Sequence, residues 1–483
     1  MTHPLRRGGA AALLSALVCA VPAALPGAAG PGSADGPPPP LALVGATLID
    51  GTGAPPVSDA VVVVRDGRIA CAGTRAECPP PEGIETLDLG GRFLTPGLID
   101  AHVHFSQTGW ADGRPDALDV RERFPYAEVV ADLQAHPERF FRAWLCSGVT
   151  AVFDVGGYPW TFDLAARAEA AEAAPRVTAA GPLLSTLDHW LNLPGERQFI
   201  YLEDEEAARR GVEYLAARGA GAAKVWYIAV SEREPEAMRR AVEAAGEEAA
   251  RRGLPLIVHA TELETAKAAL RAGADLLVHS VWDRPVDEEF LELARDSSAV
   301  YCPTLTVVRG YQRMFEAAAA GRAPEVDDPH GCVDSETLAR VAATAGVGPV
   351  VEPEQLARRA ERTAERERIA AENLARVVAA GIPVAMGTDA GNPLTLHGPS
   401  IYAELEAMEA AGMSPAAVLV AATRGGARAL GREDELGTVE AGKAADLLVL
   451  GADPTRSASA FRNVVSVVRG GRVWRVEELA AGR

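Results

Sequence analysis

The chain has 483 residues, enough for a large catalytic domain with a smaller one, and its 48% hydrophobic and 23% charged residues are ordinary for a soluble globular protein. The net charge of −19 argues against a nucleic-acid partner, because phosphates require a basic surface. Its six cysteines are scattered and include no CxxC pair, which excludes a disulfide scaffold and argues against a thiolate metal site.

The N-terminus has the pattern of a secretory signal. Two arginines precede an apolar run over residues 10–25, and small residues follow it. The run is short for a bilayer span and is interrupted by proline, so a cleaved signal over 1–29 is favoured over a membrane anchor. We therefore expect export to a secreted, periplasmic or cell-surface location, by the Sec or the twin-arginine route. No stable membrane span would remain, and residues 30–40 are expected to form a flexible linker.

Both ends of the remaining chain are predicted to be rich in β-structure. Residues 41–95 contain short β-branched runs, and Asp66–Gly67 is a dipeptide that favours a hairpin turn. Residues 431–483 repeat this pattern around a second turn at Gly470–Gly471. We therefore expect the two chain ends to form one small β-sandwich domain.

The middle of the chain, residues 96–430, alternates short apolar runs with helical stretches rich in Ala, Glu and Arg. The strand-like runs are LIDAHVHF, GVTAVFDV, RVTAAGP, AAKVWYI, PLIVHA, ADLLVHS, VYCPTL and PVAMGTDA. These eight strands with intervening helices predict an α/β fold, a (β/α)8 TIM barrel, with a doubly wound sheet as the alternative. The segment 309–380 is long for one crossover and is expected to contain extra helices.

Polar side chains occur at or near the carboxyl ends of five of these runs. They are His102, His104, Lys224, His259, His279 and Asp389. In a barrel that end of the strands is the catalytic face, so the five segments are expected to converge. Because side chains alternate along a strand, His102 and His104 point the same way and form a candidate metal-binding pair.

Each of these residues has an ordinary structural explanation when taken alone. His259 could be a core histidine, and Asp389 could cap a following helix. Chance does not readily place four of nine histidines at strand ends, however. Lys224 lies in an otherwise apolar run, and burying an ammonium is costly, so it requires a partner or a chemical modification.

Taken together, TPGLIDAHVHF, the later lysine, two separated histidines and GTDAG resemble the amidohydrolase superfamily. Within it, the chain is most similar to the group of imidazolonepropionase-like proteins and metal-dependent Xaa-Pro dipeptidases (prolidases). The similarity extends from GATLIDGTG to GTVEAGKAADLLVL. It implies a metal-dependent hydrolase that cleaves an amide or peptide C–N bond in a small molecule or dipeptide, such as an Xaa-Pro dipeptide or an N-acyl amino acid.

The resemblance also implies two divalent metal ions. The ligands of the first ion would be His102, His104 and Asp389, and those of the second would be His259 and His279. Nitrogen and oxygen ligands without thiolate suit zinc or a similar divalent ion, with zinc favoured. Metal-activated water would attack the scissile carbonyl.

The resemblance further implies that Lys224 bridges the two ions. Its amine would first take up CO2 to form a carbamate, which acts as a carboxylate on a long stem. The alternative is a single metal ion, with Lys224 held by a nearby carboxylate such as Asp389. Asp389 would also be the catalytic residue that takes a proton from the water and passes it to the leaving amine.

Further residues are candidates for substrate contacts. Trp226 and Tyr227 follow Lys224 and either reach the substrate or belong to the core. His189 and His397 occur in stretches where loops at the catalytic face are expected, and both are candidate pocket residues.

Three of the cysteines also carry expectations. Cys71 and Cys78 are close enough in sequence to form a disulfide in an exported protein, although free thiols remain the alternative. Cys302 is expected to be a small buried apolar group.

Two other functions remain open. The chain could be a deaminase, or a hydrolase of a cyclic amide or lactone, because members of one superfamily share the metal site and differ in their loops. Lys224 favours the binuclear hydrolytic branch. The chain could instead be an inactive barrel that acts as a binding protein, although retention of all six ligand-type residues argues against this. Nothing in the sequence names the substrate, and a homo-oligomer is compatible with it.

Overall fold

The structure is a computed structural model that describes residues 38–481. The expected signal over 1–29 and most of the expected linker lie outside the described residues. Within 38–481, no helix has the length and apolar character that crossing a membrane requires.

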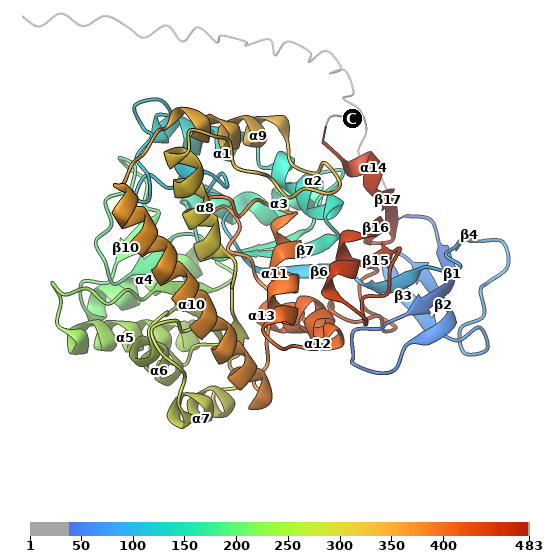
Figure 1. Cartoon of the computed structure of the whole chain (residues 1–483). Helices are drawn as coiled ribbons and strands as arrows, with labels where there is room; N and C mark the ends of the chain where they lie inside the picture. The colour runs from blue at the N-terminus through green and yellow to red at the C-terminus, as the bar shows by residue number, and fades with distance from the viewer. Residues whose placement is uncertain (1–37, 482–483) are drawn as a thin grey trace, which may run out of the picture. The chain divides into compact units, whose positions relative to one another are not determined.

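The two chain ends share one sheet. Its strand order is β17-β16-β15-β5-β1-β2-β3, and β4 also pairs with β1. The strands are β1 (Leu41–Leu48), β2 (Val57–Arg65), β3 (Arg68–Gly73), β4 (Glu85–Asp88), β5 (Phe93–Pro96), β15 (Leu447–Leu450), β16 (Val464–Arg469) and β17 (Arg472–Arg475). Figure 1 shows the N-terminal strands in blue beside the C-terminal strands in red. The strands expected to pack as a sandwich belong to one continuous sheet, because β5 pairs with both β1 and β15.

The two predicted hairpin turns are present in this sheet. Asp66 and Gly67 have φ values of 51° and 72°, and Gly470 and Gly471 have values of 58° and 83°. Positive φ at both central residues is the requirement of the tight turns that match strand twist. The turns also pack against each other, since a Cβ on Gly67 would lie 3.0 Å from the carbonyl oxygen of Gly470.

The middle of the chain contains two parallel sheets, β6-β7-β8 and β10-β9-β11-β12-β13-β14. Their strands are β6 (Leu98–Val103), β7 (Val149–Asp154), β8 (Arg176–Ala179), β9 (Leu183–Ser185), β10 (Phe199–Tyr201), β11 (Ala223–Trp226), β12 (Leu256–His259), β13 (Leu276–Val278) and β14 (Val300–Cys302). The third predicted run forms β8 and is followed directly by β9. Since β8 pairs with β7 and β9 pairs with β11, this part of the chain links the two sheets.

The eighth predicted strand, residues 383–390, is not a regular strand. It makes isolated bridges from Val384 to Tyr301 and from Ala390 to Val103. Asp389 has a φ of 63°, which interrupts the extended conformation. The segment still lies between β14 and β6, the outer strands of the two sheets, and thus takes the place of the eighth barrel strand.

Helices connect most of these strands. They are α1 (Tyr126–Ala135), α2 (Glu138–Cys146), α3 (Leu164–Ala170), α4 (Glu205–Ala217), α5 (Pro235–Arg252), α6 (Leu263–Arg271), α7 (Glu288–Asp296), α8 (Val307–Ala319), α9 (Ser335–Ala342), α10 (Pro353–Ala379), α11 (Ser400–Ala410), α12 (Pro415–Val420), α13 (Gly426–Ala429) and α14 (Val476–Leu479). Helix α5 packs against β11 and β12, and α6 packs against β13. The extra helices expected within 309–380 are α8, α9 and α10.

Two disulfides stabilise this arrangement. The expected Cys71–Cys78 pair is present, and a second pair joins Cys146 at the end of α2 to Cys332 before α9. The second pair was not expected, because its members are 186 residues apart and meet only in the folded chain. Cys302 is buried, as expected, and is unpaired among residues 38–481.

Candidate metal centre

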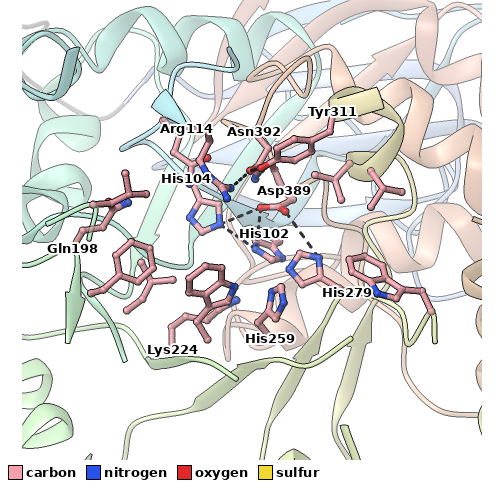
Figure 2. Close-up of a pocket in the computed structure, with 18 residues that line it drawn as sticks. His102, His104, Arg114, Gln198, Lys224, His259, His279, Tyr311, Asp389 and Asn392 are labelled. Atoms are coloured by element: carbon pink, nitrogen blue, oxygen red, sulfur yellow. Dashed lines mark hydrogen bonds and ion pairs between the residues drawn. The ribbon is translucent and has the colours of Figure 1, made fainter. Parts of the chain in front are cut away.

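A pocket at the carboxyl ends of the barrel strands contains all six residues that were expected to be metal ligands. They are His102, His104, Lys224, His259, His279 and Asp389. Figure 2 shows the four histidines and the aspartate close together, with Lys224 at the lower left. The sequence therefore located residues that the fold brings into one cavity from five separate segments.

Three of these residues form a tight group. His102 Nε2 lies 3.3 Å from His104 Nε2 and 3.3 Å from Asp389 Oδ1, and His104 Nε2 lies 3.1 Å from Asp389 Oδ1. The backbone sets this geometry, since the Asp389 N–H donates to the His102 carbonyl at 2.8 Å. Ligands at about 2.1 Å from a tetrahedral zinc ion are roughly 3.4 Å apart. The three atoms therefore have the spacing of ligands around one metal ion.

Hydrogen bonds around this group also suit a metal. His104 Nδ1 is 2.7 Å from the Gly156 carbonyl oxygen, so Nδ1 donates and Nε2 keeps its lone pair. Asp389 Oδ1 is buried and has no hydrogen-bond partner among the described residues. A buried carboxylate oxygen without a donor is costly, and a cation between it and the two Nε2 atoms would satisfy it. The residues present therefore fit a divalent metal.

The protonation states favour metal binding as well. Burial, and then positive charge on Lys224 or on a neighbouring histidine, lowers the pKa of His102, His259 and His279 well below the ordinary histidine value. Burial acts to raise the pKa of Asp389, but the interaction with His104 and the charge on His279 lower it overall. Near neutral pH the imidazoles are thus neutral and the carboxylate is charged, as metal ligands must be.

The second group lies directly beside the first. The ring centroids of His259 and His279 are 4.3 Å apart, and those of His102 and His279 are 4.8 Å apart. One ligand atom each from His102, His279 and Asp389 lie within 4.8 Å of one another. His279 is therefore close to the first group as well as to His259.

Lys224 reaches this centre from β11. Its side chain is buried, and burial lowers its pKa to about 7. Asp389 forms its ion pairs with His102, His104 and His279, and Lys224 is not among its partners. The geometry therefore gives no support to the alternative in which Asp389 holds the ammonium.

One expected substrate residue needs correction. Trp226 lines the pocket, whereas Tyr227 does not. Tyr227 is buried and lies near Arg239 and Glu243 of α5, because it follows Trp226 on the opposite side of the chain. Tyr227 therefore belongs to the core between the strands and α5.

His189 and His397 do not line the pocket either. His189 stacks on Phe199 with ring centroids 4.7 Å apart, and Phe199 forms the wall itself. His397 stacks on Phe140 at 3.9 Å and lies 3.2 Å from the His104 carbonyl oxygen. Both histidines are behind the wall, where they support residues that reach the cavity.

Several polar residues of the pocket were missed. Arg114 forms two hydrogen bonds to Asp116, of 2.8 and 2.6 Å, and a third to Asn392 Oδ1. The Tyr311 hydroxyl also donates to Asn392 Oδ1, at 2.5 Å. Figure 2 shows Arg114 and Asn392 on the side of the pocket that carries His104 and Asp389. Their positions in segments that follow the first and eighth strand-like runs were the available signal.

Two glutamines are further pocket residues that the sequence did not reveal. Gln107 and Gln198 are both buried and line the cavity. Gln107 Oε1 has no hydrogen-bond partner among the described residues, whereas Gln198 Oε1 accepts from the Tyr126 hydroxyl at 3.1 Å. Their amides add hydrogen-bonding groups near the apolar part of the wall, which includes Leu183, Leu191 and Phe199.

Comparisons with known proteins agree with this geometry. The model of the family described as the amidohydrolase family matches residues 93–474. An imidazolonepropionase from Caulobacter vibrioides (strain NA1000 / CB15N) is 28% identical over 446 residues, which are 87% of this chain and 94% of that protein. A solved Xaa-Pro dipeptidase with bound methionine has a TM-score of 0.68 at 21% identity, over 90% of this chain and 100% of its own. A solved molinate hydrolase has a TM-score of 0.67 at 24% identity, over 91% and 95% of the two chains. Since the family model covers most of the chain, the protein belongs to the amidohydrolase family and is a hydrolase of carbon–nitrogen bonds.

Proposed function

We propose that the protein is a binuclear metal hydrolase of N-acyl amino acids, Xaa-Pro dipeptides included. The observation that carries this proposal is one pocket that contains six ligand-type residues and a partly buried arginine, Arg114. The ligand-type residues account for hydrolysis of the C–N bond, and Arg114 accounts for a carboxylate on the substrate.

We assign the proton transfers of the proposed reaction to Asp389. Its carboxylate lies among His102, His104 and His279, and its lowered pKa keeps it charged near neutral pH. A bound divalent metal supplies an activated water and polarises the scissile carbonyl. Asp389 accepts the proton that the water loses and then donates it to the leaving nitrogen, which departs as an amine.

The proposal also includes a carbamate on Lys224. Asp389 is the one carboxylate among the pocket-lining residues of the described chain, and it cannot neutralise two divalent cations. Reaction of the Lys224 amine with CO2 forms a nitrogen–carbon bond and releases a proton, which leaves an anionic ligand. The buried position of Lys224 supports this step, because a pKa near 7 leaves much of the amine neutral and nucleophilic.

The substrate carboxylate is assigned to Arg114. Asp116 fixes the guanidinium through two hydrogen bonds, and Asn392 Oδ1 accepts a third from it. Arginine binds carboxylates through charge-assisted hydrogen bonds, which have a defined geometry. Phe199 and Trp226 offer an apolar surface for the rest of the substrate.

A matched pair of substrates tests this assignment. An N-acyl amino acid and its C-terminal amide differ only in the charge that Arg114 would recognise. We expect kcat/KM to be about 30- to 100-fold higher for the acid, which corresponds to a charge-assisted hydrogen bond. The substitution Arg114→Met should remove this preference. Equal turnover of both compounds by the wild-type protein would contradict the proposal.

The chain offers a matched control for Arg114→Met. Arg121 forms the same two-bond interaction with Asp119, two residues before it, but it is exposed and outside the pocket. Arg121→Met should leave the preference for the acid unchanged. The alternative functions are deamination and the opening of a cyclic amide, and the similarity to an imidazolonepropionase is compatible with them. Release of ammonia from a heterocycle would favour the first, and turnover of a cyclic amide would favour the second.

We also propose that the protein is exported. The two disulfides support this, because disulfides persist in oxidising compartments. After removal of a signal that contains Cys19, the mature protein would expose one thiol, Cys302, on denaturation without reductant, and five after reduction. Mass spectrometry after alkylation would count them and would identify the mature N-terminus. Five thiols before reduction would contradict the proposal.

A further inference from the structure

A buried carboxylate lies outside the pocket, beneath the segment that connects β14 to α8. Glu404 of α11 is completely buried. Its oxygens accept hydrogen bonds from the Leu305 N–H at 2.7 Å, the Thr306 N–H at 3.0 Å and the Thr306 hydroxyl at 2.9 Å. The proposed reaction does not use Glu404, yet a fully buried carboxylate is too costly to be incidental.

The segment that Glu404 holds continues directly into the metal centre. Thr304 precedes Leu305 and has a φ of 44°, a left-handed conformation that is unfavourable for a β-branched residue. Surrounding contacts must maintain such a conformation. The hydrogen bonds from Glu404 to the next two residues are contacts of this kind.

Thr304 in turn contacts a candidate metal ligand. Its hydroxyl oxygen lies 2.6 Å from His279 Nδ1. An imidazole that donates from Nδ1 keeps the lone pair on Nε2 for a metal, and such outer partners fix the orientation of the ring. The His279 N–H also donates to the Cys302 carbonyl, so the end of β14 and the residues after it control both the backbone and the ring.

We propose that Glu404 is a positioning residue for His279, which acts through Thr304. Its carboxylate fixes residues 305 and 306, these hold Thr304 in its left-handed conformation, and Thr304 orients the His279 ring for metal binding. The inference rests on the proposed function in one respect, namely that His279 is a metal ligand. It concerns the ion that His279 binds, whatever substrate the enzyme cleaves.

Both carboxyl oxygens of Glu404 are required by this geometry. Three donors converge on its two oxygens. A glutamine would turn an NH2 group toward one of the backbone N–H groups and lose at least one hydrogen bond. The isosteric substitution Glu404→Gln therefore tests the interaction with little change in volume.

The test measures zinc affinity by competition with a chromogenic chelator, on apo-protein reloaded with zinc. Loss of an outer partner of a ligand typically weakens metal binding by about 10- to 100-fold. We expect Glu404→Gln to lower the affinity for the zinc ion that His279 binds by about tenfold. Unchanged affinity would overturn the proposal.

A control is available on the same helix. Glu409 of α11 accepts from the Ala458 N–H at 2.7 Å and the Ser457 hydroxyl at 3.2 Å, and it does not line the pocket. Glu409→Gln should lower thermal stability through the same kind of loss and leave zinc affinity within about twofold. Equal weakening by both variants would show a general structural effect and would overturn the proposal.

A double-mutant cycle tests the route through Thr304. Thr304→Val removes the hydroxyl and should weaken zinc binding, whereas Thr304→Ser should retain it. Because Glu404 acts through Thr304, Glu404→Gln should add little to Thr304→Val. Fully additive effects would contradict this route. A raised KM of Glu404→Gln with unchanged zinc affinity would also contradict this route. Such a result would indicate an effect through α8, whose Tyr311 lines the pocket.

A milder variant covers the case in which Glu404→Gln does not fold. Thr306→Val removes one of the three hydrogen bonds to Glu404 and should weaken zinc binding by a smaller factor in the same direction. No change in affinity would overturn the proposal. Failure of the proposed function is recognised separately, as a wild-type protein that binds zinc but cleaves no substrate of the panel.

Discussion

The two sides of the metal centre differ in charge. The carboxylate side consists of His102, His104 and Asp389, from β6 and the segment after residue 383. The lysine side consists of Lys224 within β11, His259 at the end of β12 and His279 directly after β13. The first side combines imidazoles with an anion, whereas the second offers only nitrogen atoms, one of them in an amine.

This difference indicates an order of metal binding. The carboxylate side already has ligand spacings of 3.1 to 3.3 Å and a carboxylate oxygen without a donor. The lysine side lacks a fixed anion, and a divalent cation there would face a buried amine. We therefore expect the carboxylate side to bind its ion without modification, and the lysine side to require the carbamate.

The largest effect is expected at Asp389, the anion of the carboxylate side. Asp389→Asn removes the charge and the proton acceptor but keeps the volume, so we expect kcat/KM to fall by about 10³-fold or more, as general-base loss and weakened metal binding combine. Steady-state kinetics with the preferred acyl amino acid would measure this. The thermal transition should change little. Activity within tenfold of wild type would show that another group handles the proton.

Lys224→Ala should separate the two sides. Removal of the bridging ligand should reduce bound zinc from about two ions per chain to about one and lower kcat/KM by about 10²-fold or more. Metal analysis of the purified variant, with kinetics, would show both losses. A short carboxylic acid added to the variant should restore part of each, because it can replace the carbamate.

The carbamate on Lys224 can also be tested directly in the wild-type protein. Crystallographic density at Lys224, after preparation with zinc and bicarbonate, should show the extra carboxyl group. A bare amine beside one fully occupied ion would eliminate the binuclear arrangement. The enzyme would then be mononuclear, with only the carboxylate side used.

The sequence predicted the carboxylate side and the lysine side equally well, because every member lies at or near the end of an apolar run. Barrel topology brings such ends together, so spacing along the chain was sufficient. The approximate positions of the helices and the β-rich ends were also recognisable from periodicity. Asp389 shows the limit of this reasoning, since its φ of 63° interrupts the strand that its apolar neighbours predict.

The walls around the centre could not be predicted in the same way. Arg114 lies ten residues beyond His104 in an irregular segment, and no periodicity gives its direction. His189 and His397 are polar residues in expected loops, but aromatic rings separate them from the cavity. Cys146 and Cys332 meet through tertiary packing alone. These features depend on loop conformation, which local sequence determines weakly.

Removal of zinc should distinguish the two sides by the order in which their ions leave, which is a smaller effect than those of the substitutions above. During dialysis against a chelator without bicarbonate, we expect the ion of the lysine side to leave first, since loss of CO2 converts its anionic ligand to an amine. Metal content and activity should pass through a stage with about one ion per chain. Bicarbonate with zinc should restore the second ion, whereas zinc alone should restore less. Simultaneous loss of both ions would contradict the difference between the two sides.

The smallest effect is expected at the wall of the lysine side, where adjacent aromatic residues have different surroundings. Trp226 lines the pocket with its ring centroid 6.0 Å from that of His259, whereas Tyr227 is buried near α5. Trp226→Ala should raise KM by about tenfold, since it removes apolar surface from the substrate site. Tyr227→Phe should leave kcat and KM within about twofold, because it retains the ring and the hydroxyl does not face the cavity. A series of substrates with longer apolar acyl groups would measure this, and the penalty of Trp226→Ala should grow with acyl size. If Tyr227→Phe instead raised KM while Trp226→Ala did not, the substrate would approach the lysine side from the direction of α5, opposite to the wall described above.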